Sequence, residues 1–360
     1  MSTSGGWGGW GGWGGWGGWN GWSGNSGGGS PPSDPLLSRM LWQSRKATLP
    51  AFDPANIFGA QYPKNIKLAT QLDDPAAMDR WDPFIRYNLC LFEAMGGLTL
   101  DATGGKYADL KVGSSTLVRM HRIVDSKIIE KQLQAVDSWA KLRGDRSEEI
   151  VIQMAPQKPF WNTILNLQPH RHRRTNELIE LTVALAAICS IRFKHALQVP
   201  RPAELSGRIQ PLVPTPEHGS LPSGHATEAF AVAEIMSLLL GKDAQQDARI
   251  EQLGFLAARI AENRVVAGVH YPMDSAAGHT LAVGVTSYLH RLAKKVAITG
   301  VEFNPAQFQV INETGAVKDF VWPSTTQKFV GPKETVPNAE AVKASALISK
   351  LWTEAAGEWN

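Results

Sequence analysis

The chain has 360 residues, which is enough for one large domain or two ordinary ones. Its hydrophobic content of 43% and charged content of 19% are typical of globular proteins, and a formal net charge of +3 is too small to indicate nucleic-acid binding. The two cysteines, Cys90 and Cys189, lie in apolar runs. We expect them to be small buried hydrophobes rather than a disulfide or a metal site.

Residues 1–34 are low in complexity. Tryptophan recurs at every third position from Trp7 to Trp22, separated almost wholly by glycine. Glycine at this density costs too much backbone entropy, and no aliphatic residues offer a core, so we expect a disordered tail. In an alternative interpretation, the evenly spaced indoles make weak multivalent contacts with a partner, a membrane surface or one another.

Helical signals dominate from Trp81 onward, after a Pro-containing stretch at 35–75 that we expect to wrap the domain as an extended arm. Helices are predicted over residues 83–94, from Asp125 to near Gly144, and over residues 147–155. Four longer helical stretches are predicted at 175–197, 223–240, 246–265 and 271–295, with a Pro-rich loop at 200–222. Residues 300–334 are expected to hold short strands or loops, and 338–355 a last amphipathic helix.

Strand signals are sparse, so the sequence predicts an all-α fold built as a helical bundle. We divide the chain into a tail at 1–34, an arm with helices at 35–170, a catalytic core at 171–300 and an extension at 301–360. The apolar run from Leu181 to Ile191 is too short to cross a bilayer, and no signal peptide is recognisable. We therefore expect a soluble, cytoplasmic protein.

Three short segments carry the candidate chemistry. They are Lys194 with Arg201-Pro202, then Pro222-Ser223-Gly224-His225, then Arg264 with His270 and Asp274. Arg201 and Arg264 each present a planar fork of donors to an oxyanion, and Lys194 adds a third cation. Each alone would be read as a surface charge. Arg264, however, directly precedes the apolar run 265–269, where a charge needs a partner such as an anion.

The second segment precedes the apolar helical stretch 226–240. Pro222 suits a first helical turn, and Ser223 and Gly224 are expected to present free backbone N–H groups to an anion. His225 would then lie near that anion, with a pKa range suited to proton transfer. On its own, His225 would be read as a satisfied core histidine.

The third segment pairs an imidazole with a carboxylate. His270 and Asp274 are four residues apart and therefore lie on one face of a helix. A carboxylate on one ring nitrogen fixes the tautomer and leaves the other nitrogen as a lone-pair donor, able to attack phosphorus or to bind the metal of an oxyanion such as vanadate. An isolated pair of this kind would be an ordinary helix-surface contact.

Taken together, the three segments resemble the signature of the type 2 phosphatidic acid phosphatase and vanadium haloperoxidase superfamily. The resemblance runs from Lys194 to Asp274 and implies a helical bundle of that type. It implies the following oxyanion-binding residues: Lys194, Arg201, Ser223, Gly224 and Arg264. It makes His225 the acid/base group, and His270, oriented by Asp274, either the phosphoryl acceptor or the vanadium ligand. The family often has serine before the last arginine, where this chain has Asn263.

Phosphatase and peroxidase share this cage, because vanadate and the phosphoryl-transfer transition state have similar geometry and charge. The lack of spans and of a signal peptide disfavours the membrane and secreted phosphatases of the family. His218, five residues before Ser223, is a further candidate catalytic residue, because bromoperoxidases of the family are similar in having a histidine there. We therefore expect a vanadate-dependent haloperoxidase that favours bromide. The stretch 268–272 resembles both branches equally.

Two alternatives stay open. One is a phosphatase that needs no cofactor and forms a phosphohistidine at His270, and the other is an inactive oxyanion-binding or scaffold protein. The expected partners are halide with hydrogen peroxide, or a phosphate ester; no nucleic acid is expected, and a homo-oligomer is possible. The basic run 170–174 is interpreted as a solvated loop, and His195 and His279 as structural residues.

Overall fold

The computed structural model describes residues 36, 39–40, 43–44, 73–241, 247–308, 334–335 and 343–359. The Gly/Trp repeat and nearly all of the expected arm lie outside these residues. The described residues from Pro83 onward belong to one compact unit, and the described residues before Pro83 belong to another. Within the latter, Asp74 caps the short helix η2 (Pro75–Arg80), its side chain accepting a hydrogen bond from Ala76 N at 2.9 Å.

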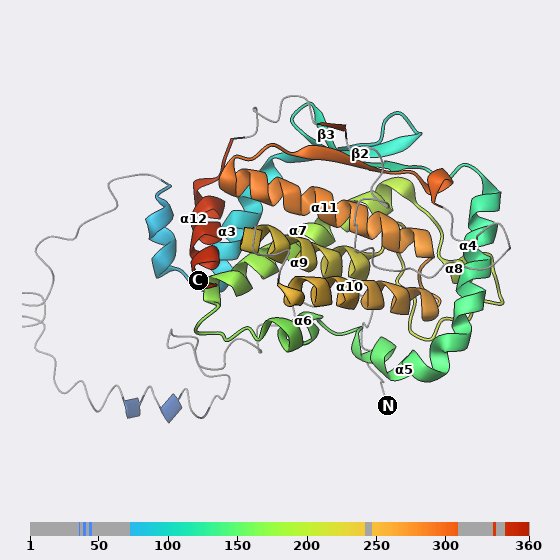
Figure 1. The fold of residues 1–360 in the computed structure, drawn as a ribbon, viewed down its shortest axis with the longest axis horizontal. Helices are drawn as coiled ribbons and strands as arrows, with labels where there is room; N and C mark the ends of the chain where they lie inside the picture. Colours follow the sequence, from blue (N-terminus) through green and yellow to red (C-terminus); the bar gives the residue numbers. More distant parts are fainter. Residues whose placement is uncertain are drawn as a thin grey trace, which may run out of the picture. The chain divides into compact units, whose positions relative to one another are not determined.

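The larger unit is mainly helical, which confirms the predicted fold class (Figure 1). Its helices are α3 (Pro83–Gly96), α4 (Ser126–Trp139), α5 (Arg143–Ile152), α6 (Lys158–Leu165), α7 (Arg173–Leu197), α8 (Pro202–Leu205), α9 (Gly224–Leu240), α10 (Ala248–Val266), α11 (Pro272–Lys294) and α12 (Ala346–Gly357). The helices predicted between residues 83 and 295 are present within a few residues of their expected ends. The last predicted helix, 338–355, begins only at Ala346, and the start of its expected range lies outside the described residues. The sequence did not predict α6 or the short α8 inside the Pro-rich loop. The proposed division into four segments stays a prediction.

Helix α9 is the centre of the bundle and packs against α7, α10 and α11. Its buried residues lie on all sides, as expected of a helix surrounded by other helices. At its start Ser223 accepts a hydrogen bond from Ala226 N at 3.4 Å. At its end Gly241 has a φ of 65°, a conformation that glycine adopts without a steric penalty. Asp125 likewise caps α4 by accepting from Lys127 N at 2.9 Å, as the sequence predicted.

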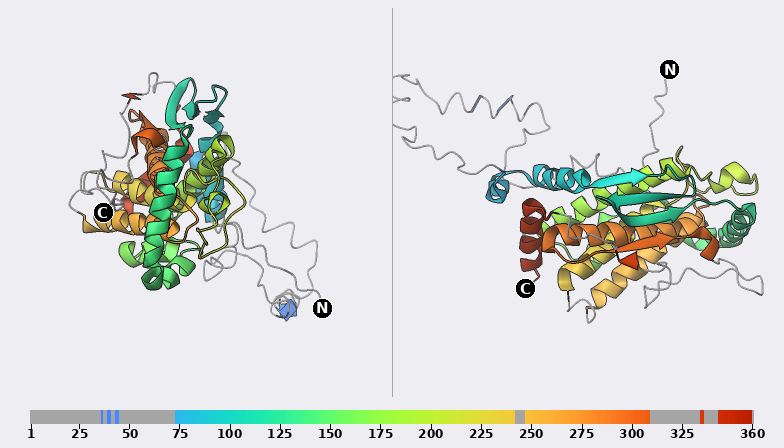
Figure 2. Two further views of the ribbon diagram at one scale, coloured as in Figure 1. Left: turned by 90° about the vertical axis from the view of Figure 1, so that its right-hand side faces the viewer. Right: turned by 90° about the horizontal axis from the view of Figure 1, so that it is seen from above.

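A small sheet lies along one side of α11, as Figures 1 and 2 show. Its strands are β1 (Leu98–Asp101), β2 (Tyr107–Val112), β3 (Ser115–His121), β4 (Thr299–Phe303) and β5 (Glu334–Thr335), in that order across the sheet. The first three form an antiparallel meander, β4 joins β3 in parallel, and β5 joins β4 antiparallel.

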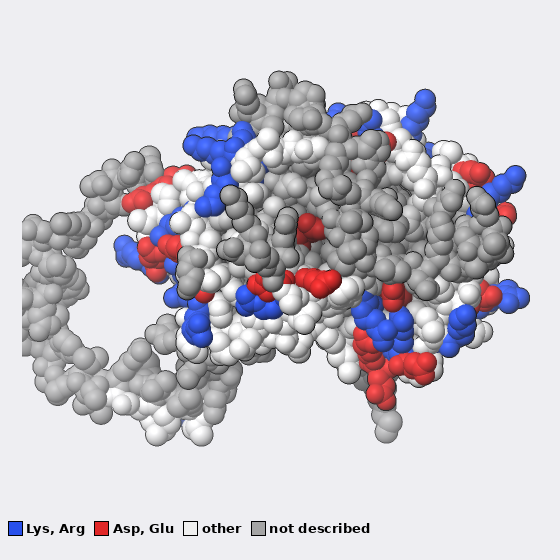
Figure 3. All heavy atoms as spheres, in the orientation of Figure 1, with Lys and Arg blue, Asp and Glu red and all other residues white. Residues whose placement is uncertain are grey.

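Strands β1–β3 were not predicted. The sequence of β2 does alternate with a period of two, since Ala108, Leu110 and Val112 are apolar and Asp109 and Lys111 are charged, so this strand has a local signal that the prediction missed. Strand β4 at the start of the 300–334 region and β5 at its end agree with the expectation of strands or loops there. Cys90 and Cys189 are free and buried, as expected. Lys and Arg lie beside Asp and Glu on the face that Figure 3 shows.

Gly284 of α11 allows the helix to approach the sheet closely. A Cβ atom there would lie 2.2 Å from Val118 Cγ2 of β3 and 3.4 Å from Val301 Cγ2 of β4. Valine is stiff about χ1, so neither side chain can turn away at low cost. The small residue is therefore required where the helix crosses these strands.

We predict that Gly284→Ala destabilises the protein by about 1–3 kcal/mol through overpacking. The matched control is Gly144→Ala in α5, where a Cβ would meet nothing within 4 Å. There alanine should be stabilising by about 0.5–1 kcal/mol, because it has the higher helix propensity. Urea unfolding measures both changes, and equal midpoints for wild type and Gly284→Ala would contradict the prediction.

Candidate oxyanion site

The structure brings the three sequence segments together at the ends of the central helices. Lys194 lies in the last turn of α7, and Arg201 directly precedes α8. Ser223 caps α9, and Gly224 and His225 form its first turn. Arg264 lies in the last turn of α10, His270 two residues before α11, and Asp274 in the first turn of α11.

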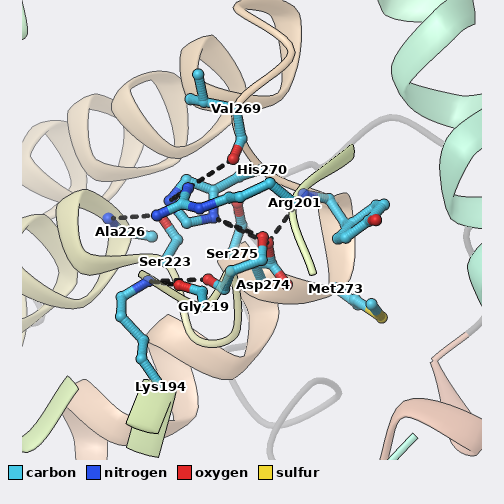
Figure 4. Close-up of polar contacts among 12 residues, drawn as sticks. Lys194, Arg201, Gly219, Ser223, Ala226, Val269, His270, Met273, Asp274 and Ser275 are labelled. Carbon is cyan, nitrogen blue, oxygen red and sulfur yellow. Dashed lines mark hydrogen bonds and ion pairs between the residues drawn. The ribbon is translucent and has the colours of Figure 1, made fainter. Parts of the chain in front are cut away.

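Arg201 connects the first segment to the third. Its Nη1 donates to Val269 O at 2.6 Å and to His270 Nε2 at 3.0 Å (Figure 4). Its Nε donates to His218 O at 3.0 Å, and its Nη2 donates to His218 Nδ1 at 3.1 Å. The side chain is almost completely buried, with 1% of its surface exposed. Burial lowers the pKa of Arg201 to about 10.

Lys194 connects the first segment to the loop before α9. Its Nζ donates to Gly219 O at 3.1 Å and to Ser220 O at 2.9 Å. Burial, and then the nearby charge of Arg201, hold the pKa of Lys194 well below its usual range. A negative charge near Nζ would raise this pKa.

His270 is held by partners on both ring nitrogens. Nδ1 lies 2.8 Å from Asp274 Oδ2, and this oxygen also accepts from Tyr271 N at 3.0 Å and from the hydroxyl of Ser220. On the other side, the guanidinium of Arg201 can only donate, so His270 Nε2 carries the lone pair and Nδ1 the proton. The geometry is the one that the spacing of His270 and Asp274 predicted.

The ring of His270 is neutral. Burial, followed by the charges of Arg201 and Lys194, holds the pKa of His270 well below its usual range. A neutral imidazole with its lone pair on Nε2 can act as a nucleophile or as a ligand to an electrophilic centre.

The start of α9 differs in one detail from the sequence expectation. The N–H of Ser223 is not free, because it donates to the backbone oxygen of Asp274 at 2.9 Å. This bond ties the second segment to the third. The free donors of the helix end therefore begin after Ser223, in the turn that Gly224 opens.

His225 points its Nε2 at the backbone oxygen of Gln153, 3.1 Å away. A carbonyl oxygen only accepts, so Nε2 carries the proton and Nδ1 is the nitrogen that can gain one. The pKa of His225 is lowered to about 3, by burial first and then by the charge of Arg264, with smaller effects of Lys194 and Arg201.

Arg264 is buried, with 2% of its surface exposed. Its Nη2 donates to Ile150 O at 2.9 Å and to Gln153 Oε1 at 3.3 Å, whereas its Nε is buried and has no hydrogen-bond partner among the described residues. Burial lowers the pKa of Arg264 to about 10. Asn263 is also engaged, since its Nδ2 donates to Gln153 Oε1 at 3.0 Å.

His218 has its side chain near the cage, although the residue as a whole is exposed. Its Nδ1 accepts from Arg201, so its ring is linked to the buried guanidinium. Partial burial of the ring and the charge of Lys194 lower the pKa of His218 to about 4. Sequence reasoning identified this histidine, and the structure adds its link to Arg201.

The site has an excess of buried positive charge. None of Lys194, Arg201 and Arg264 forms an ion pair with a carboxylate in the part of the chain that the structure describes; their donors go mainly to backbone oxygens. Buried cations without a direct ion pair are costly, and an oxyanion would supply a partner of opposite charge. The unpartnered Nε of Arg264 is a donor of the kind that such an anion requires.

Sequence reasoning missed two residues of this site. Ser220 donates to Asp274, but it lies in an irregular loop where no periodicity marks it. Gln153 accepts from Arg264, which is 111 residues away along the chain. Neither has a local signal, and only a comparison of contacts in space identifies them.

Among the described residues, no group of three or more His, Cys, Asp or Glu side chains could hold a metal ion, and no helix is long and apolar enough to span a membrane. No curated protein matches the chain. The family model for the PAP2 superfamily matches residues 178–297, a range that includes all three segments of the site. The three segments of the site thus lie in the part of the chain that is similar to the PAP2 superfamily.

Proposed function

We propose that this site binds a tetrahedral oxyanion beside His270 Nε2 and that the chain, with vanadate bound, is a haloperoxidase that oxidises halide, preferentially bromide, with hydrogen peroxide. One observation carries the oxyanion: three buried cations form no ion pair with a carboxylate among the described residues, and two of them, Lys194 and Arg201, act on the neutral imidazole of His270. The lone pair of His270 Nε2 accepts from Arg201 here and would be released when that guanidinium turns to a bound anion. The similarity to the PAP2 superfamily is consistent with this class of enzyme.

Each residue has a stated task in this proposal. Lys194, Arg201 and Arg264 would hold the oxygens of vanadate, with the first turn of α9 adding main-chain donors, and His270 Nε2 would be the ligand to vanadium. When bound, vanadate would supply a Lewis-acidic centre that activates hydrogen peroxide towards halide. Asp274 keeps the proton of His270 on Nδ1 and thereby keeps Nε2 available.

Two further histidines, His225 and His218, have roles in this proposal. His225 would receive or return a proton at Nδ1, because its Nε2 is already bonded to a backbone oxygen. His218 is the ground for proposing a peroxidase first, because bromoperoxidases of the superfamily are similar in having a histidine there, and its ring contacts Arg201, where it can influence protonation near a bound anion. The cytoplasmic location stays a prediction, as does any partner of the Trp repeat.

A phosphatase is the second candidate, and the environment of His225 favours it. Bound phosphate would offset the positive charges that help to hold the pKa of His225 at about 3, so that this imidazole would gain a proton on substrate binding. His270 Nε2 would attack phosphorus, the bond to the leaving oxygen would break, and that oxygen would take the proton from His225. Water would then hydrolyse the phosphohistidine.

We predict that the protein loaded with vanadate brominates an indicator substrate in the presence of bromide and hydrogen peroxide. His270→Ala should reduce this activity by about 10³-fold or more, because the variant loses the only proposed protein ligand to vanadium. The control is His195→Ala, since His195 lies next to Lys194 in the sequence but is exposed. It should leave turnover unchanged.

The same preparations are assayed for aryl-phosphate hydrolysis without vanadate. Phosphate release without any bromination would overturn the peroxidase proposal in favour of the phosphatase. Binding of phosphate with neither activity would indicate an oxyanion-binding or scaffold protein. Full activity of His270→Ala in either assay would show that the reacting group is not at His270.

We also predict a pH dependence of stability that depends on His225. In the unfolded chain a histidine takes up its proton near pH 6.5, but in the folded protein His225 does so only near pH 3. The unfolded state therefore binds more protons below about pH 6.5, so this group's contribution to stability is complete above that pH and is lost as the pH falls towards 3. The loss is about 1.4 kcal/mol per pH unit.

Urea unfolding at pH 7.5, 5.5 and 4.5 measures this effect. The variant His225→Gln keeps a side-chain N–H donor for the backbone oxygen of Gln153 but cannot titrate, so its stability should fall less steeply with decreasing pH than that of the wild type. Parallel curves for the two proteins would show that His225 is not held neutral by the fold.

A further inference from the structure

The last turn of α5 reaches two different segments of the oxyanion site. Gln153 ends this helix and is completely buried, with 0% of its surface exposed. Its backbone N–H donates to Glu149 O at 2.9 Å, which fixes its position relative to the helix. The family model begins at residue 178, so Gln153 lies outside the matched range.

The backbone oxygen of Gln153 determines which nitrogen of His225 carries the proton. The distance from His225 Nε2 to this oxygen is 3.1 Å, and the oxygen can only accept. The proton is therefore on Nε2, and Nδ1 is left for exchange with a bound group. Without this acceptor, only the weaker intrinsic preference of the neutral imidazole would determine the populations of its two tautomers.

The side chain of Gln153 holds the third segment. Its Oε1 accepts from Asn263 Nδ2 at 3.0 Å and from Arg264 Nη2 at 3.3 Å. Its Nε2 donates to Glu149 Oε1 at 2.9 Å, and Glu149 is in turn paired with Arg259 at 2.8 Å. Because a carboxylate only accepts, the orientation of the amide is determined: nitrogen faces Glu149 and oxygen faces the two donors.

This contact also accounts for Asn263, where the superfamily signature often has serine. The longer amide of asparagine reaches Gln153 and is buried with 0% exposure. Asn263 and Gln153 thus form a pair that supports Arg264 from the side of α5. Arg264 receives a second support from the same turn, through Ile150 O at 2.9 Å.

We propose that Gln153 is a positioning residue of the oxyanion site, which orients the guanidinium of Arg264 through its side chain and sets the tautomer of His225 through its backbone oxygen. The proposal rests on the proposed function in one respect, that the site binds an oxyanion. It adds a residue from outside the signature segments and gives the helix α5 a role in the site.

The test compares Gln153→Met with the wild type. Methionine has a similar volume but offers neither the acceptor for Asn263 and Arg264 nor the donor for Glu149. We expect the dissociation constant for inorganic phosphate, measured by calorimetry, to rise about 10-fold to 100-fold, as is usual when an outer-shell hydrogen-bond partner is lost. The same rise is expected for vanadate.

A second variant tests the proposal even if Gln153→Met fails to fold. Asn263→Ala removes only one of the two hydrogen bonds to the amide oxygen of Gln153, so the dissociation constant for phosphate should rise by a smaller factor. Asn176→Leu removes another buried amide, one that donates to His172 O at 2.6 Å. Asn176 lies about 27 Å along α7 from Lys194 at 1.5 Å per residue. The substitution Asn176→Leu should therefore leave phosphate binding unchanged.

Ring ¹⁵N spectra of His225 in the ligand-free protein provide a readout that does not depend on anion binding. In both the wild type and Gln153→Met we expect the signature of a proton on Nε2, because methionine keeps the backbone oxygen that accepts it. A proton on Nδ1 in the wild type would overturn the role of the backbone oxygen. Phosphate affinity within twofold of the wild type in folded Gln153→Met, or an equal loss in Asn176→Leu, would overturn the proposal. If the wild type binds neither phosphate nor vanadate, the proposed function fails, and the ¹⁵N spectra alone decide the role of Gln153.

Discussion

The burial of three cations that form no direct ion pair with a carboxylate among the described residues is the constraint on which the rest of this site depends. Lys194, Arg201 and Arg264 have between 1% and 3% of their surface exposed, and backbone oxygens accept most of their hydrogen bonds. Backbone oxygens accept hydrogen bonds from these side chains but do not neutralise their charge, so the site favours the binding of an anion. The fold maintains this arrangement because the carbonyls come from loops and helix ends held by the packing of the central helices.

The state of the two site histidines follows from the same charge. Positive neighbours and burial disfavour a further cation, so His225 and His270 are neutral, and what distinguishes them is the nitrogen that carries the proton. Asp274 places it on Nδ1 of His270, and Gln153 places it on Nε2 of His225. One ring thus offers a lone pair for bonding, and the other a nitrogen that can gain a proton when an anion enters. Two chemically identical side chains acquire different tasks from their hydrogen-bond acceptors.

The helical part of the fold was predictable because its signals are local. The cap at Asp125 and the stop at Gly241 lie within one turn of the helix ends that they determine, and apolar periodicity spans each long helix. Strands β1–β3 were not predicted, although β2 alternates apolar and charged residues from Ala108 to Val112, because short strands gain most of their stability from pairing and, for β3, from packing on α11. In the site, the three segments were identifiable from their spacing, whereas Ser220 and Gln153 act across tens of residues of chain and have no motif of their own.

The sequence by itself determined the residue types of the site, their order and the helix ends that carry them, because these depend on spacings of a few residues. The four-residue spacing of His270 and Asp274 also indicated their contact, although His270 lies two residues before α11 rather than on its face. Only the tertiary structure decided that the cations lack carboxylate partners among the described residues, that the N–H of Ser223 bonds to Asp274, and that α5 supports the site through Gln153. The physical reason is that hydrogen-bond partners and counter-charges are set by distances in space, which the chain defines only once its helices have packed.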